Sequence, residues 1–405
     1  MRVLLSTYGS RGDVEPLAAL AARLRELGAQ VRICVSPDEV FAELLGRVDV
    51  EVVTVGKPKV ALSEPSQESQ AAQRAAELAA QYDTVVAAAE GCDVLLATGL
   101  AHFSSRSAAE KLGIPYVYAT FSPLILRTHH QPPPLLLPGQ THPPGVTDNR
   151  ALWDLHAQTL TSLYGEALNN HRASVGLPPV ENAYDFAFTR RPWLASDPVL
   201  GPWPETPDLD VVHTGAWIQP DERLLADDLL AFLDAGTPPV FVGFGSTQEV
   251  AADAAKVSIG AIRAHGRRAI VGRGWAELAR IDDGADCFVV GEANLQVLFG
   301  RVAAVMHHGG AGTTTIAAQA GAPQVVVPQA VDNPYWAARV ADLGIGAAHD
   351  GPTPTTESLT AALATALSPR TLARARAVAG SMHTDGAEVG AKLLLETAAG
   401  GAVGR

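Results

Sequence analysis

The sequence has little cysteine and no long hydrophobic run, and each shortage excludes a class of protein. Cys34, Cys92 and Cys287 are the only cysteines among 405 residues, and their wide spacing fits neither a disulfide framework nor a CxxC metal site. We interpret them as reduced packing residues. No apolar stretch approaches the roughly 18 residues of a membrane-spanning helix, and Met1 leads into Val3 without a signal-peptide pattern. We expect a cytoplasmic protein with no integral membrane segment.

Positive charge is also scarce. Lysine and arginine number 30 against 43 aspartates and glutamates, which gives a formal net charge of −13, and no basic run is present. This balance argues against nucleic acid or an anionic membrane as a partner. Hydrophobic residues make up 47% of the chain and charged residues 18%, so there is ample material for buried cores, and the length suits two domains.

Strand-like and helix-like segments alternate along the chain. In the first half, residues 2–7, 30–35, 51–55, 93–97 and 112–123 contain apolar, strand-like runs. An amphipathic helix is expected from near Pro16 to Gly28. The second half repeats the pattern, with strands expected at 238–243, 268–271, 287–290, 302–306 and 324–327. Such alternation predicts an α/β fold whose parallel sheets are covered on both faces.

Residues 302–320 form the most informative stretch. An apolar strand is followed by His307, His308, the glycines 309, 310 and 312, and then a helix-compatible segment with Thr313 to Thr315. A glycine turn lets a ligand approach the backbone, and a helix start presents unpaired N–H groups and a positive dipole end. The stretch therefore suits an anion such as a diphosphate, although a tight turn between strand and helix is the alternative.

At two places, an acidic residue follows a strand at the edge where parallel sheets carry their ligands. Asp332 and Asn333 come after the strand at 324–327, so we expect them near whatever is attached to the anion. Asp13 ends the turn Tyr8–Asp13 after the first strand. From the residues alone, Asp13 is either a helix N-cap or a general base.

A proline-rich stretch at 127–145 cannot be a regular helix or a central strand. It contains His129, His130 and Pro133, and it is either a disordered surface loop or a preorganised binding surface. Residues 201–220 are also proline-rich and form the expected interdomain linker. Asp208 and Asp210 within this linker spell DxD, but without strands around them we predict no metal site.

The stretch 302–333 resembles the donor-binding signature of family 1 glycosyltransferases of the GT-B type, in particular the bacterial enzymes that glycosylate vancomycin-type glycopeptides. The resemblance extends over nearly the whole chain. It implies two Rossmann-like domains whose parallel sheets face across a deep cleft. The expected divisions are an acceptor domain at 1–200, a linker at 201–220, a nucleotide-sugar domain at 221–380, and a C-terminal helix at 381–405 that crosses back to the first domain.

The resemblance also implies roles for single residues, and for Asp13 it favours the general base. The expected diphosphate-binding residues are Ser10, Arg11, Ser246, His308, Gly309, Gly310, Gly312, Thr313 and Thr314. Asp332 and Asn333 are expected to bind the sugar. Trp275 and Val290 are expected near the nucleobase, with a core role as the alternative for Trp275. His129, His130 and Pro133 are expected to bind the acceptor.

The implied activity is metal-independent, inverting transfer of a hexose from UDP-glucose or UDP-N-acetylglucosamine to a hydroxyl of a glycopeptide aglycone. The donor is a substrate, so no cofactor is expected. A TDP-deoxysugar transferase on the same acceptors is the alternative, because Asn333 stands where many glucosyl-transferring relatives have glutamine. An epimerase of the same fold, a nicotinamide-dependent oxidoreductase, a non-catalytic binding module and a hybrid chain of two parent enzymes are less favoured.

Overall fold

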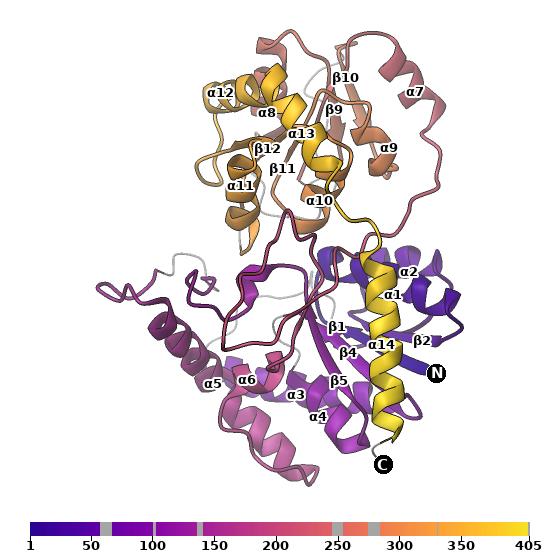
Figure 1. The fold of residues 1–405 in the computed structure, drawn as a ribbon, viewed down its shortest axis with the longest axis vertical. Helices are drawn as coiled ribbons and strands as arrows, with labels where there is room; N and C mark the ends of the chain where they lie inside the picture. Colours follow the sequence, from indigo (N-terminus) through magenta and orange to yellow (C-terminus); the bar gives the residue numbers. More distant parts are fainter. Residues whose placement is uncertain are drawn as a thin grey trace. The chain divides into compact units, whose positions relative to one another are not determined.

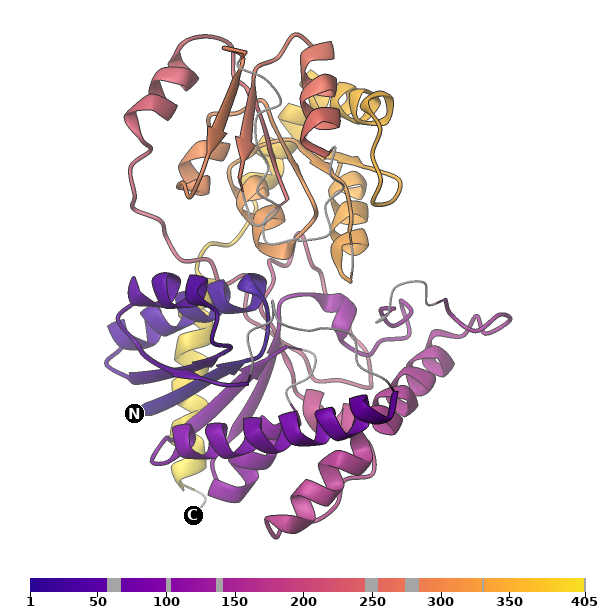
Figure 2. The ribbon, with the colours of Figure 1, turned by 180° about the vertical axis from the view of Figure 1, so that it is seen from behind.

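The computed structural model describes residues 1–56, 67–99, 103–135, 141–244, 254–273, 284–329 and 331–403. The chain forms two compact units (Figures 1 and 2). The first contains Met1–Ser196, Trp203–Gln219 and Thr384–Arg405, and the second contains Asp197–Pro202 and Pro220–His383. Each unit has its own parallel sheet with helices, so the predicted α/β class is confirmed.

The sheet of the first unit has the strand order β3-β2-β1-β4-β5-β6-β7, and all neighbouring strands are parallel. The order reverses between β1 and β4, which lie side by side with Leu4 opposite Leu95. The strand bounds are β1 Arg2–Thr7, β2 Gln30–Val35, β3 Glu51–Thr54, β4 Val94–Thr98, β5 Tyr116–Thr120, β6 Trp193–Leu194 and β7 Val212–His213.

Helices cover this sheet. Tyr82 and Val85 of α3 and Ala108 of α4 pack with Leu4 and Leu95 in one buried cluster. The helix bounds in this unit are α1 Arg11–Glu26, α2 Glu39–Gly46, α3 Gln67–Ala89, α4 Phe103–Leu112, α5 Asn149–Ser174, α6 Ala183–Phe188 and α14 Gly386–Val403, with a short 3-10 turn, η2, at Pro123–Ile125.

The structure differs from expectation at residues 201–220. We expected a linker there, but residues 203–219 belong to the first unit. They supply β7 to the sheet and bury Trp217, which is 2% exposed. The last helix, α14, belongs to the same unit and lies alongside α1 (Figure 1). A proline-rich composition therefore marks irregular backbone in this segment, and the segment is nevertheless packed.

The sheet of the second unit has the order β10-β9-β8-β11-β12-β13, again with parallel neighbours. Its strands are β8 Val240–Gly243, β9 Ala269–Gly272, β10 Cys287–Val290, β11 Ala304–His307, β12 Gln324–Val326 and β13 Gly346–Ala348. Its helices are α7 Asp227–Asp234, α8 Ala254–Ala264, α9 Leu295–Phe299, α10 Ala311–Gln319, α11 Asn333–Asp342, α12 Thr356–Ala366 and α13 Pro369–Ala379.

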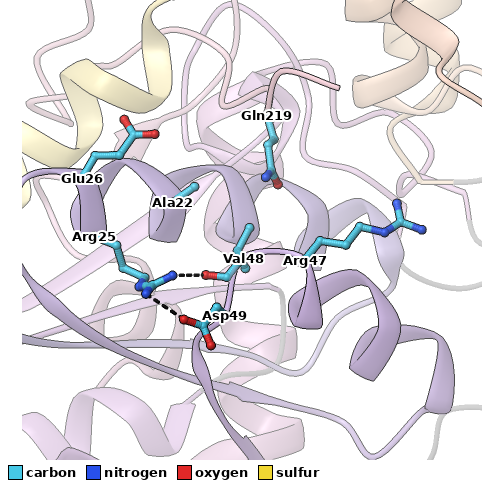
Figure 3. A pocket seen from close by; sticks show the side chains of 7 residues that line it. All are labelled: Ala22, Arg25, Glu26, Arg47, Val48, Asp49 and Gln219. Carbon is cyan, nitrogen blue, oxygen red and sulfur yellow. Dashed lines mark hydrogen bonds and ion pairs between the residues drawn. The ribbon is translucent and has the colours of Figure 1, made fainter. Parts of the chain in front are cut away.

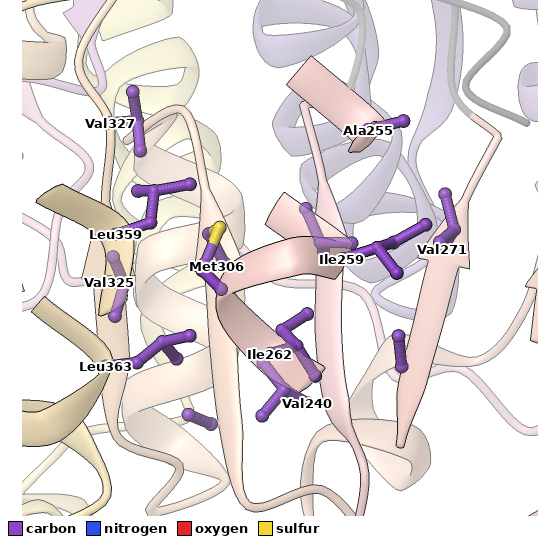
Figure 4. Close-up of a cluster of buried hydrophobic side chains, with 14 of the residues drawn as sticks. Val240, Ala255, Ile259, Ile262, Val271, Met306, Val325, Val327, Leu359 and Leu363 are labelled. Carbon is purple, nitrogen blue, oxygen red and sulfur yellow. The ribbon is translucent and has the colours of Figure 1, made fainter. Parts of the chain in front are cut away.

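Alternate residues of these strands face opposite layers of helices. Met306 packs with Ile259 of α8 and Leu359 of α12 in the cluster of Figure 4. Its neighbour Val305 joins the cluster on the other face, with Leu298 of α9. Burial on both faces explains why the strands are continuous apolar runs. In the described part of the chain, no helix is both long and apolar enough to cross a membrane.

Candidate functional site

The expected anion-binding residues lie where the strand order of the second sheet reverses. β8 and β11 are neighbours, and the chain leaves their carboxyl ends toward helices on different sides, which is the usual place for a ligand in such sheets. His307 ends β11, and residues 308–310 lead directly into α10. We call residues 307–310 the glycine loop. Ser246, which follows β8, lies outside the described residues.

The glycine loop places the ring of His308 over Gly310. A Cβ added to Gly310 would lie 2.5 Å from Nε2 of His308, so the ring occupies the space that any larger residue would need. Gly310 is also the N-cap of α10. The ring of His308 and the free N–H groups of the first turn, at Ala311, Gly312 and Thr313, therefore lie at the same helix end.

Burial governs the charge of His308. The loss of solvent lowers the pKa of His308 to about 4, so the ring is neutral at pH 7. Its Nδ1 is buried and has no hydrogen-bond partner among the described residues. A neutral imidazole carries its proton on one nitrogen only. His308 can therefore donate one hydrogen bond to an anion from a site that does not itself carry a positive charge.

The threonines of α10 differ from one another. Thr314 is fully buried, and its hydroxyl donates to the carbonyl of Gly310 at 2.9 Å. Thr315 donates in the same way to Ala311 at 2.8 Å. Thr313 is only half-buried. Among the threonine hydroxyls expected at the diphosphate, that of Thr314 is thus engaged within the helix.

Asp332 and Asn333 lie at the start of α11. Asp332 is its N-cap, and its Oδ2 accepts a hydrogen bond from the indole of Trp336 at 2.8 Å. Asn333 is 8% exposed. Its Nδ2 lies 3.4 Å from the carbonyl oxygen of Gly309, and its Oδ1 accepts from the N–H of Gln329 at 3.3 Å. The structure thus brings Asn333 and the glycine loop together.

Of the two residues expected near the nucleobase, only Val290 lies among the described residues. Val290 is buried at the end of β10, and its carbonyl accepts a hydrogen bond from the N–H of Arg273 at 2.9 Å. Trp275 lies outside the described residues. The carboxyl end of β10 is thus tied to the end of β9, and both belong to the edge at which the glycine loop begins.

In the first unit, Asp13 lies in the turn of α1 that follows β1. The helix begins at Arg11 with Ser10 as its N-cap, so Asp13 is the third helical residue and our alternative of Asp13 as the N-cap is wrong. Its Oδ2 instead accepts a hydrogen bond from the N–H of Ser10 at 2.8 Å. This bond holds the carboxylate back toward the end of β1.

The backbone around Asp13 fits closely against it. A Cβ added to Gly9 would lie 2.1 Å from Oδ2 of Asp13, so only glycine leaves room for the carboxylate here. Burial raises the pKa of Tyr118 well above its usual value, and the charge of Asp13 adds to that shift. Arg11 pairs with Glu15 at 2.7 Å. Asp13 is therefore held at the reversal between β1 and β4, where the first sheet offers its ligand edge.

The residues expected at the acceptor lie before α5. The rings of His129 and His130 have centroids 3.9 Å apart, and Asn149 donates to the carbonyl of His129 at 2.9 Å. His130 is exposed, whereas Pro133 is buried. Pro133 therefore packs within the segment and does not offer the exposed apolar surface that we expected there.

A surface pocket of about 450 Å³ lies elsewhere on the first unit (Figure 3). Arg25 bridges it by donating to the carbonyl of Val48 at 2.6 Å and to Asp49 at 2.9 Å. The lining residues are Ala22, Arg25, Glu26, Arg47, Val48, Asp49 and Gln219. None of these is an expected site residue, and the charged groups at its wall are already paired: Arg25 with Asp49, Glu26 with Arg23, and Arg47 with Glu43. We assign it no ligand.

One buried polar residue of this site, Gln324, was not predicted from the sequence. Gln324 opens β12 and is fully buried, and its Oε1 lies 2.8 Å from Nε2 of His307. A single polar residue at the start of the apolar run Gln324–Val327 was the available signal. Nothing in the sequence indicates, however, that Gln324 faces His307, because the pairing depends on the register of β11 against β12.

Comparison with known proteins connects these sites. Residues 3–130 match the glycosyltransferase family 28 N-terminal domain, and residues 276–391 match the erythromycin biosynthesis protein CIII-like C-terminal domain. The chain is 56% identical over 402 residues to the vancomycin aglycone glucosyltransferase of Amycolatopsis orientalis, covering 98% of this chain and 97% of the relative. It is 53% identical over 388 residues to the dTDP-epi-vancosaminyltransferase of the same organism, covering 93% of each.

Solved structures agree on the fold. The glycosyltransferase of kitacinnamycin has a TM-score of 0.76 at 18% identity, with 98% of each chain covered. Glycosyltransferase VinC, solved in complex with dTDP, has a TM-score of 0.69 at 20% identity, with 98% of this chain and 99% of VinC covered. This chain therefore belongs to the GT-B glycosyltransferase family that includes the vancomycin-group glycosyltransferases, and it is an enzyme of that family.

Proposed function

We propose that the protein transfers a hexose from a UDP-sugar, of the UDP-glucose or UDP-N-acetylglucosamine type, to a hydroxyl of a glycopeptide antibiotic aglycone. The observation that carries the donor half is the placement of His308 over Gly310 at the first turn of α10. The acceptor half rests on the relative of 56% identity, whose name gives the vancomycin aglycone as its acceptor.

The diphosphate would take its hydrogen bonds from the glycine loop and the first turn of α10. The N–H groups of Ala311, Gly312 and Thr313 and the neutral ring of His308 are fixed donors that need no reorganisation when charge develops on the leaving oxygen. Preorganised donors of this kind typically stabilise a transition state by about 3 kcal/mol each. Ser246 and Thr313 would add hydroxyl donors, and Asp332 would orient the sugar. The reaction then requires neither a metal nor a cofactor.

Asp13 would act as the general base. As the acceptor oxygen bonds to the anomeric carbon, the bond from that carbon to the diphosphate oxygen breaks on the opposite face, and the configuration inverts. The acceptor's proton passes to the carboxylate of Asp13. The hydrogen bond from the N–H of Ser10 fixes one carboxylate oxygen, which orients the group for this transfer.

The alternative donor is a TDP-deoxysugar. A named dTDP-epi-vancosaminyltransferase is almost as similar in sequence as the glucosyltransferase, and VinC was solved with dTDP. We favour the UDP-hexose because the pair His307–His308 followed by two glycines is intact, which resembles the glucose-type members of the family, whereas some deoxysugar-transferring members have an interrupted loop. The amide of Asn333 is shorter than the glutamine of many glucosyl-transferring relatives, so selection between hexoses is open to test.

The test compares wild type with Asp13→Asn, using a vancomycin-type aglycone and three donors: UDP-glucose, UDP-N-acetylglucosamine and a TDP-deoxysugar. We expect product with a UDP-hexose, unchanged binding of UDP by the variant, and a fall in kcat of about 100- to 10,000-fold. Glu26→Gln removes a carboxylate at the far end of the same helix and should leave kcat unchanged. Normal turnover by Asp13→Asn would exclude Asp13 as the base, and product with the TDP-sugar alone would exclude the UDP-hexose.

A further inference from the structure

Gly309 is held at both of its peptide groups. Its N–H donates to Nδ1 of His307 at 3.1 Å, and its carbonyl lies 3.4 Å from Nδ2 of Asn333. Its φ angle is +92°, a conformation that favours glycine. An added Cβ would lie 2.8 Å from Cγ1 of Val326. The middle of the glycine loop is thus fixed by the side chain of His307 within the loop and by that of Asn333 from α11.

The contacts of His307 define its tautomer. Nδ1 accepts the hydrogen bond from Gly309, so the ring proton lies on Nε2, which is 2.8 Å from Oε1 of Gln324. The amide Nε2 of Gln324 in turn donates to the carbonyl of Thr314 in α10 at 3.3 Å. Each link has one donor and one acceptor only in the neutral Nε2–H form. Burial, with a smaller contribution from the neighbouring His308, lowers the pKa of His307 to about 3.

Asn333 completes the arrangement from the other side of Gly309. Its Nδ2 contacts the carbonyl of Gly309 and Oδ1 of Asp332, both at 3.4 Å, while its Oδ1 accepts from the N–H of Gln329 at 3.3 Å. The side chain is also buried. Its amide therefore contacts a backbone group at each end, which is the geometry of a residue that supports a loop.

We propose that His307, Gln324 and Asn333 are positioning residues, a loop clamp that holds Gly309 so that His308 and the first turn of α10 are aimed at the donor's diphosphate. This proposal rests on the proposed function, and it says which residues hold that site in place. Asn333, which the family resemblance assigns to the sugar, acts here through the backbone of Gly309. Displacing such a support by a fraction of an ångström misplaces every donor beyond it.

The effect on the reaction follows from the order of the contacts. His308 is the residue between His307 and Gly309, so its backbone is fixed on both sides by the clamp. Gln324 also reaches α10 at Thr314, so the strand end and the helix start are tied to each other. Loss of Gln324 releases the ring of His307 and the helix together. Diphosphate binding and kcat should both fall, because the leaving group carries the charge that these donors stabilise.

The first test uses the full chain with Gln324→Met, which keeps a similar volume and removes both amide atoms. We expect the affinity for UDP, measured by calorimetry, and kcat/KM each to fall by about 10- to 100-fold. Leu363→Ala is the matched control. It removes a buried side chain from the core of the same unit and lowers stability without contacting the clamp, so at a temperature where both variants are folded it should bind UDP as wild type does.

The second measurement reads the tautomer directly and does not depend on activity. In protein labelled with ¹⁵N-histidine, the signals of His307 are identified by their loss in His307→Gln. We expect wild type to show a neutral Nε2–H ring at this position that does not titrate between pH 5 and pH 8. In Gln324→Met this signature should change to a mixture of tautomers or to a titrating ring.

The outcomes separate the two proposals. A wild type that binds neither UDP nor dTDP overturns the proposed function, and the clamp falls with it. A wild type that binds nucleotide while Gln324→Met binds equally well, with an unchanged His307 spectrum, overturns the clamp alone. A loss of affinity in Leu363→Ala as large as that in Gln324→Met also overturns the clamp, because general destabilisation would then explain both.

Discussion

At the residue scale, glycines decide where the candidate functional side chains can lie. Gly9 leaves room for the carboxylate of Asp13, and Gly310 leaves room for the ring of His308. In both cases an added Cβ would come within 2.5 Å of the functional group, a separation that no packed structure tolerates without a shift. These glycines therefore act on function through their neighbours.

We predict that Gly310→Ala lowers the affinity for UDP by about tenfold or more, equivalent to about 1.4 kcal/mol. The new methyl group would displace the ring of His308, whose Nε2 lies 2.5 Å from the Cβ position. Gly46→Ala is the control, since Gly46 ends α2 in the first unit, is not an expected site residue, and its Cβ would meet no protein atom within 4 Å. Calorimetry with UDP compares the two variants. Equal affinities in both would show that the ring of His308 does not contribute to nucleotide binding.

Sequence alone could identify Asp13, His308 and the glycine loop as candidates because residue type and order carry that signal. It could not identify Gln324 as the partner of His307, because the two are joined only through the register of β11 and β12. It also misjudged the start of α1. Pro16 suggested the first helical position. The helix instead begins at Arg11, and the N–H of Ser10 donates to the carboxylate of Asp13 at this N-terminal end.

At the element scale, α14 depends on small residues where it meets the segment 215–217. A Cβ on Gly390 would lie 2.8 Å from Nε1 of the buried Trp217. A Cβ on Gly386 would lie 2.4 Å from the carbonyl carbon of Gly215. The absence of side chains at these two positions lets the helix pack closely against a segment that sequence composition marked only as a proline-rich connection.

We predict opposite effects for two glycine-to-alanine changes in α14. Gly390→Ala should destabilise the protein by about 1 to 3 kcal/mol, because the methyl group overpacks the contact with Trp217. Gly400→Ala meets nothing within 4 Å and should stabilise by up to about 1 kcal/mol through helix propensity. Urea denaturation followed by circular dichroism measures both. A Gly390→Ala protein as stable as Gly400→Ala would contradict the close contact.

Helix α5 supplies a pH-dependent prediction. His156 packs against Trp153 and Tyr184 with ring centroids 5.4 Å and 5.8 Å away, and burial, with a smaller effect of His142, lowers the pKa of His156 to about 4. Between pH 4 and the ordinary value of about 6.5 the unfolded chain binds a proton that the native state does not. Acidification through this window therefore favours unfolding.

We expect His156→Gln to weaken this dependence. The unfolding free energy of wild type should fall more steeply than that of the variant from pH 6.5 toward pH 4, by at most about 1.4 kcal/mol per pH unit. Denaturation at a series of pH values measures the difference between the two curves. Above pH 7 the curves should run parallel, since His156 is neutral in both states. Parallel curves over the whole range would contradict the lowered pKa.

At the scale of the whole molecule, the chain passes between its two units at four places, after residues 196, 202, 219 and 383. The alternation of strands and helices predicted an α/β fold, and the fold is confirmed. The passages could not be predicted, because each depends on which unit a short segment packs against. Residues 197–202 show this: Leu200 is fully buried with Trp336 and Val340 in a cluster of the second unit.

Asp197 joins two of these passages, and a final prediction follows from it. The carboxylate is fully buried. Its Oδ1 accepts from the N–H of Val199 at 2.8 Å, and its Oδ2 accepts from the N–H of His383 at 2.8 Å. Residue 197 begins the first chain segment of the second unit, and residue 383 ends the last one. The side chain of Asp197 therefore links these two ends.

Asp197→Ala should lower the unfolding free energy by about 1 to 3 kcal/mol, because it removes a buried carboxylate and leaves the part-buried N–H groups of Val199 and His383 without their acceptor. Asp350→Ala removes an exposed carboxylate of the same unit and should change stability by less than about 0.5 kcal/mol. Chemical denaturation measures both, and hydrogen exchange at His383 and Val199 should rise in Asp197→Ala alone. If Asp197→Ala unfolds like Asp350→Ala, water replaces the carboxylate at these N–H groups, and Asp197 does not stabilise the two passages.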